Sequence, residues 1–119
     1  MTQTVFITGA SSGIGLALAR KYAQQGATLG LLGRRADVLE QVRASLDNAE
    51  RHTTYAVDVC IESDLHAAAR DFITQHGAPD IVIAAAGISA GTWTEYYEDL
   101  AQIRRIFETN VLAMASTFH

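Results

Sequence analysis

The sequence feature that most constrains the fold is the segment Thr8–Gly15, which reads Thr-Gly-Ala-Ser-Ser-Gly-Ile-Gly. It follows directly on the apolar run Val5–Ile7 and opens onto a stretch whose apolar residues have helical spacing. A glycine-rich turn between a strand and a helix presents the first backbone amides of the helix, which have no intrahelical partner and lie at the positive end of the helix dipole. The segment therefore predicts a site for a phosphate group.

Each glycine of this turn has a separate expected role. Gly9 allows the chain to reverse sharply as it leaves the strand. Gly13 keeps the backbone bare, so that a pyrophosphate can approach the amides, and Gly15 lets the helix pack close to the strand. The spacing G-x3-G-x-G differs from the generic dinucleotide fingerprint G-x-G-x-x-G. The candidate phosphate-binding residues are Gly9, Ser11, Ser12, Gly13, Ile14 and Gly15.

The rest of the chain alternates short apolar runs with helical patterns. The expected strands are Thr4–Ile7, Thr28–Leu32, Thr53–Val57 and Ile81–Ala86. The expected helices run from about Ile14 to a cap at Gly26, from Ala36 to about Leu46, from Glu62 to His76, and from about Glu95 or Asp99 to the end. Short links and right-handed crossovers predict an α/β fold with a parallel sheet in the order 3-2-1-4 and helices on both faces.

Composition excludes several classes of protein. The 119 residues predict a single domain, 1–119, and 49% apolar with 18% charged residues argues against disorder. A net charge of -4 gives no basic surface for nucleic acid or an anionic membrane. A single cysteine, Cys60, excludes a disulfide framework, and the cysteine and histidines lack metal-ligand spacing. We expect a cytoplasmic protein without a membrane span and without a metal site.

The octet Thr8–Gly15 in this context resembles the cofactor-binding turn of the short-chain dehydrogenase/reductase family, whose members have a Rossmann fold and use NAD or NADP. The resemblance extends over essentially all 119 residues, which correspond to about the first half of a typical member. It implies a truncated, doubly wound Rossmann-type fold and the cofactor-binding portion of an oxidoreductase.

The residues after the second expected strand, Gly33, Arg34 and Arg35, bear on the choice of cofactor. In a dinucleotide fold this position faces the adenosine ribose, where a carboxylate accepts from a 2'-hydroxyl and a cation neutralises a 2'-phosphate. Two guanidiniums without a carboxylate predict NADP rather than NAD. The alternative is a pair of solvated charges, although cations at a helix N-terminus oppose the helix dipole unless an anion is bound.

Asp58 and Val59 close the third expected strand. The resemblance implies that the Asp58 carboxylate meets the adenine amino group and that Val59 flanks the ring. The alternative for Asp58 is a helix cap or turn residue.

Similarly, Ala85–Gly87 matches the family's Asn-Ala-Gly turn beside the nicotinamide ribose, with Ala85 in place of asparagine and Ala86 and Gly87 in register. Asn110 matches the family's helix asparagine, which holds a water relay behind the catalytic lysine.

The catalytic tyrosine and lysine of the family, four residues apart, have no counterpart in the sequence. The only lysine is Lys21, and no Tyr-x-x-x-Lys occurs. We therefore expect a chain that binds NADP(H) without turnover and belongs to an oxidoreductase acting on carbonyls or alcohols. The alternative is a non-catalytic nucleotide-binding, regulatory or assembly module. The uncharged, proline-free strand Ile81–Ala86 and the apolar pattern after it further predict self-association.

Overall fold

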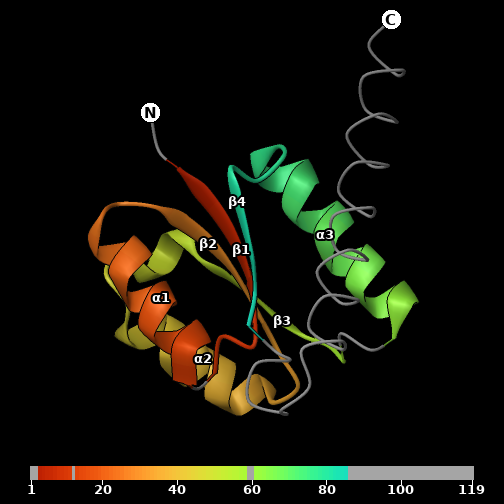
Figure 1. Ribbon diagram of the computed structural model, residues 1–119, viewed down its shortest axis with the longest axis horizontal. Coiled ribbons are helices and arrows are strands. Elements are labelled where there is room, and N and C mark those ends of the chain that lie inside the picture. Colours follow the sequence, from red (N-terminus) through yellow and green to blue (C-terminus); the bar gives the residue numbers. More distant parts are fainter. Residues whose placement is uncertain (1–2, 12, 59–60, 86–119) are drawn as a thin grey trace, which may run out of the picture.

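A computed structural model of the chain describes residues 3–11, 13–58 and 61–85 (Figure 1). The described strands are β1 (Thr4–Thr8), β2 (Thr28–Gly33), β3 (Thr53–Ala56) and β4 (Ile81–Ala84). The described helices are α1 (Gly13–Gln24), α2 (Ala36–Ser45), a 3₁₀ turn at Ala49–Arg51, and α3 (Glu62–His76). Strands and helices therefore alternate along the chain as the sequence predicts.

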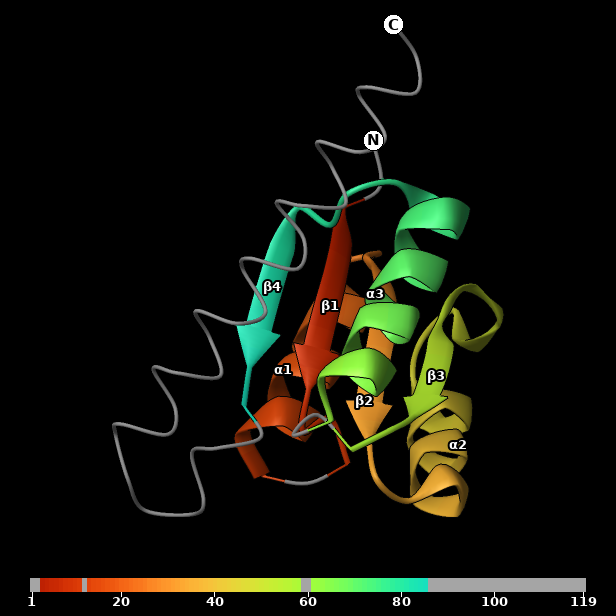
Figure 2. The ribbon, with the colours of Figure 1, turned by 90° about the vertical axis from the view of Figure 1, so that its right-hand side faces the viewer.

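The four strands form one parallel sheet in the order β3-β2-β1-β4. This confirms the predicted α/β fold and its strand order. Figure 2 shows the strands side by side with their arrowheads pointing the same way, α3 in front of the sheet and α1 and α2 behind it. The chain crosses from β3 at one end of the order to β4 at the other through α3.

Alternating side chains of the central strands fill two separate cores. Val5 and Ile7 of β1 face α1 and α2, whereas Phe6 between them faces α3. Phe6 meets Phe72 edge-on, with ring centroids 5.5 Å apart, and both rings are fully buried. Strands buried on both faces explain why the sequence shows continuous apolar runs rather than alternation.

Several element ends differ by one or two residues from the expected ones. β1 extends to Thr8 and β2 to Gly33, because both residues still pair with neighbouring strands. β3 ends at Ala56 and β4 at Ala84, so Val57 and Ala85 lie just beyond the strands to which the sequence pattern assigns them. The shift follows from pairing between strands, which a single strand's composition does not encode.

Helix α1 ends at Gln24, and the predicted cap residue Gly26 follows it with a φ of 88°. The amide of Ala27 donates to the carbonyl of Tyr22 at 3.0 Å, and that of Gly26 to the carbonyl of Ala23 at 3.0 Å. These bonds satisfy carbonyls that the helix end leaves free, and glycine adopts the left-handed conformation without a Cβ clash.

A buried histidine ties the segment after α2 to the sheet. His52 is 5% exposed, its Nδ1 accepts from the amide of Leu29 at 3.1 Å, and its Nε2 donates to the carbonyl of Asp47 at 2.8 Å. Burial lowers the pKa of His52 below its ordinary value. A neutral ring satisfies two backbone groups at once, so the pairing holds only while Nδ1 carries no proton.

Candidate functional site

The carboxyl ends of the four strands meet at one edge of the sheet. Thr8 pairs with Leu32 on one side and with Ala84 on the other, and Gly33 pairs with Ala56. β2 and β4 flank β1. From β1 the chain builds the sheet outward through β2 to β3 and then returns to the other side of β1 to form β4, so the strand order reverses beside β1. Ligands of open α/β sheets bind in the crevice outside the strand ends at such a reversal.

The turn between β1 and α1 has the backbone geometry that its glycines allow. Gly9 has a φ of 69° and Gly13 a φ of 57°. A Cβ on Gly15 would lie 2.0 Å from the carbonyl oxygen of Gly9, so only glycine fits there. The predicted close approach of helix to strand at Gly15 is therefore present.

The opening of α1 suits an anion. A Cβ on Gly13 would meet no described atom within 4 Å, which leaves open space beside the backbone. The first turn of α1 carries no acidic side chain, whereas those of α2 and α3 do, with Asp37 in α2. The positive end of the α1 dipole is thus not offset by its own side chains. The residues present fit a pyrophosphate held by backbone amides.

The turn lies directly against the end of β2. A Cβ on Gly33 would come within 3.5 Å of the Ser11 Oγ and 3.3 Å of the Leu39 Cδ2. The amide of Ala10 donates to the carbonyl of Leu32 at 3.1 Å. The glycine turn and the residues that precede Arg34 are therefore in direct contact.

Both arginines after β2 lie beside a carboxylate. The Arg34 Nη2 is 3.5 Å from the Asp58 Oδ1, and the Arg35 Nη2 is 3.9 Å from the Asp37 Oδ2. The two guanidiniums are 72% and 73% exposed, respectively. The opposition of these cations to the helix dipole is reduced within the chain itself, because each arginine has an acidic neighbour.

Asp58 belongs to a turn and does not cap α3. Its carbonyl accepts from the amide of Ile61 at 2.9 Å, and Ile61 occupies the N-cap position without a side-chain hydrogen bond. Of its two alternatives, the turn residue is correct and the helix cap is wrong. Asp58 also joins the ends of β2 and β3, a role that its place in the sequence does not indicate.

Two large apolar side chains are exposed in the described part of the chain, Ile14 at 52% and Ile61 at 47%. Ile14 lies in the first turn of α1 and Ile61 immediately precedes α3, so both flank the carboxyl edge of the sheet. Ile14 is among the candidate residues predicted from the sequence, whereas Ile61 is not. An apolar residue at a helix N-cap, where a polar one is usual, is the signal that could have found it.

Ala85 follows β4 and is buried beside β1. Its amide donates to the carbonyl of Thr8 at 3.2 Å, so its backbone reaches the base of the glycine turn. The remaining predicted site residues lie outside the described residues, as does the expected C-terminal helix. They are Ser12, Val59, Ala86, Gly87 and Asn110.

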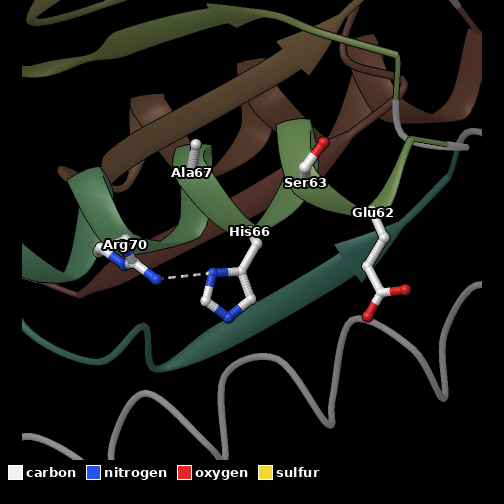
Figure 3. Close-up of a pocket in the computed structure, with 5 residues that line it drawn as sticks. All are labelled: Glu62, Ser63, His66, Ala67 and Arg70. Atoms are coloured by element: carbon white, nitrogen blue, oxygen red, sulfur yellow. Dashed lines mark hydrogen bonds between the residues drawn. The ribbon is translucent and has the colours of Figure 1, made fainter.

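A separate hollow of about 560 Å³ lies along α3 (Figure 3). Glu62, Ser63, His66, Ala67 and Arg70 line it. The Arg70 Nη2 donates to the His66 Nδ1 at 3.2 Å, and Figure 3 shows these two side chains pointing toward one another. These five described lining residues all belong to α3.

Within residues 3–11, 13–58 and 61–85, no three histidine, cysteine, aspartate or glutamate side chains are placed to hold a metal ion. The described helices are also too short or too polar to cross a membrane.

Comparison with known proteins identifies the family. The family model described as short chain dehydrogenase matches residues 3–119. The chain therefore belongs to the short-chain dehydrogenase family of oxidoreductases, which confirms the resemblance drawn from the glycine turn.

Individual relatives support this assignment. The chain is 36% identical over 110 residues to 11-beta-hydroxysteroid dehydrogenase 1A of Arabidopsis thaliana, covering 91% of this chain and 32% of the relative. It is 30% identical over 117 residues to an NADPH-dependent pterin aldehyde reductase of Arabidopsis thaliana, covering 96% of this chain and 47% of the relative. The crystal structure of L-sorbose reductase from Gluconobacter frateurii, complexed with NADPH and L-sorbose, superposes with a TM-score of 0.77 at 27% identity, covering 95% and 49% of the two chains.

The chain thus spans between about a third and a half of the length of these relatives.

Proposed function

We propose that this chain is the NADP(H)-binding portion of an oxidoreductase that transfers a hydride between the nicotinamide and a carbonyl or alcohol. The single observation that carries the proposal is the opening of α1. Open space surrounds the backbone at Gly13, and Gly15 packs directly against the backbone of Gly9. The first turn of α1 carries no acidic side chain. The relatives named for NADPH, or solved with it, support the same cofactor class.

The proposed roles follow from position. Amides near Ser12 to Ile14 hold the pyrophosphate at the positive end of α1. Arg34 and Arg35, which follow β2 at the adjoining strand end, face the adenosine ribose and meet a 2'-phosphate. The cofactor, when bound, supplies the hydride donor or acceptor. Asp58 and Val59 border the adenine, and Ala85–Gly87 border the nicotinamide ribose.

We further propose that these 119 residues alone do not transfer a hydride. The family's tyrosine acts as the acid or base and its lysine lowers the tyrosine pKa. The sequence has a single lysine, Lys21, which lies in the last turn of α1 rather than at the carboxyl edge. Asn110, the proposed water-relay residue, would act only together with such a pair. Turnover by rigorously purified chain would refute this part of the proposal.

Calorimetric titration with NADP(H) and NAD(H) tests the cofactor assignment. NADP(H) should bind more tightly, and the Arg34→Ala/Arg35→Ala variant should lose most of the difference while retaining NAD(H) affinity. Arg51→Ala is the matched control, because Arg51 is exposed and precedes β3 at the opposite edge of the sheet. Equal affinities for the two cofactors, unchanged in the double variant, would overturn the NADP assignment.

We also propose that the chain self-associates in the cytoplasm. Among the described strands, β4 lies at one end of the order, and its sequence Ile-Val-Ile-Ala has no charge or proline to discourage pairing with another chain. Ile81, Val82 and Ile83 are only partly buried. Sedimentation at tens of micromolar should show a dimer or larger species, and a stable monomer would contradict the proposal.

A further inference from the structure

We infer that Asp58 sets the cofactor selectivity of this chain by holding Arg34, so that a 2'-phosphate binds Arg34 only by exchange with an internal carboxylate. The inference rests on the proposed NADP(H) function and specifies how that site discriminates between a 2'-phosphate and a 2'-hydroxyl. It assigns to Asp58 a role in 2'-phosphate discrimination in addition to any contact with adenine.

The sheet brings these two side chains together. Arg34 directly follows β2, and Asp58 lies two residues beyond the end of β3. Gly33 pairs with Ala56, and the amide of Val57 donates to the carbonyl of Gly33 at 2.9 Å, which extends the pairing beyond the strand ends. The 3.5 Å separation of guanidinium and carboxylate is therefore a consequence of strand register.

The ion pair is exchangeable. Arg34 is 72% exposed and the Asp58 side chain 34% exposed, so water screens their attraction and the pair contributes little to stability. A phosphate monoester carries nearly two negative charges and three acceptor oxygens, and it matches the guanidinium fork at least as well as a carboxylate. A 2'-hydroxyl carries no charge and cannot displace the carboxylate. The pair therefore reduces the affinity for NADP more than the affinity for NAD.

Arg35 differs in this respect. Its partner Asp37 belongs to the first turn of α2, and the two charged atoms lie 3.9 Å apart, beyond hydrogen-bond reach. Asp37 therefore holds Arg35 less closely than Asp58 holds Arg34, and a phosphate displaces it more easily. Asp58 is the carboxylate whose removal should change selectivity.

Asp58→Asn should raise the ratio of NADP to NAD affinity by about two- to fivefold, the range measured for coupling between exposed charges. Any lost contact to adenine affects both cofactors, which share that ring, so the ratio isolates the 2'-phosphate. The same substitution in an Arg34→Ala background should leave the ratio unchanged, because the cation that Asp58 occupies is gone.

The experiment titrates four proteins, the unaltered chain, Asp58→Asn, Arg34→Ala and the double variant, with NADP and NAD. The fragments 2',5'-ADP and 5'-AMP serve as probes that lack the nicotinamide. Circular dichroism checks folding of each variant, and Asp58→Ser replaces Asp58→Asn if the latter fails to fold.

The outcomes distinguish failure of the inference about Asp58 from failure of the proposed NADP(H)-binding function. A rise in the ratio that persists without Arg34 would assign the effect to direct repulsion and overturn the inference. A fall in the ratio in Asp58→Asn would show that Asp58 orients Arg34 for the phosphate, which also overturns it. An unchanged ratio in a chain that still prefers NADP refutes the inference alone, whereas failure to bind either dinucleotide refutes the proposed function with it.

Discussion

Gly15→Ala should destabilise the chain although alanine favours helices. The added Cβ would lie 2.0 Å from the carbonyl oxygen of Gly9, 2.7 Å from its carbonyl carbon and 3.3 Å from the Ala10 Cα. All three atoms are backbone, so no side-chain rotation relieves the overlap, and the helix must move from the turn by more than an ångström. Overpacking of this kind costs about 1–3 kcal/mol, and the better helix propensity of alanine returns about 0.5–1 kcal/mol. The central values of these two ranges leave a net loss of about 1–1.5 kcal/mol.

Urea unfolding followed by circular dichroism measures this loss. With a slope of about 2 kcal/mol per molar urea, the midpoint should fall by about 0.5–0.75 M. Ala17→Gly is the matched control, because Ala17 is exposed in the same helix and the change reports helix propensity without a clash. If Gly15→Ala instead raised the midpoint by the propensity difference, the close contact between Gly15 and Gly9 could not be what requires glycine here.

The remaining predictions concern the buried His52 and the packing of Gly30 against Phe72. Because burial lowers the pKa of His52, the unfolded chain binds a proton near pH 6.5 that the folded chain resists. The free energy of unfolding should therefore fall as pH drops below about 7, by at most about 1.4 kcal/mol per pH unit, and this component should vanish in His52→Asn when the two urea midpoints are compared across pH. Gly30→Ala would place a Cβ 2.7 Å from the Phe72 Cδ1 and cost about 1–3 kcal/mol. Combining it with Phe72→Leu should cost less than the sum of the two single changes, and additive losses in urea unfolding would argue against this contact.

The sequence predicts the sheet because its central strands are buried on both faces. Val5–Ile7 and Leu29–Leu32 are apolar at every position except Gly30, and the fold needs such strands between two helical layers. Gly9 and Gly15 likewise predict a turn whose geometry only glycine allows. These features are local, so a single sequence is enough to find them.

Other features depend on residues far apart in the chain. In the sequence, His52 is a polar residue before a strand like many others. Its bonds to the amide of Leu29 and the carbonyl of Asp47 form only in the folded chain, where Leu29 lies beside it. The pairing of Arg34 with Asp58 likewise depends on the register between β2 and β3. Tertiary pairing supplies both of these features.

The acidic neighbours of Arg34 and Arg35 change the physical basis of the cofactor argument. From sequence, two cations at the start of a helix oppose the helix dipole unless an anion is bound. In the folded chain Asp58 and Asp37 supply negative charge at 3.5 and 3.9 Å, so neither arginine requires a phosphate for its own stability. The proposed preference for NADP must then arise from the difference between a phosphate and a carboxylate as partners of the same guanidinium. That difference favours the phosphate through its larger charge, and removal of the internal carboxylate should increase the preference rather than abolish it.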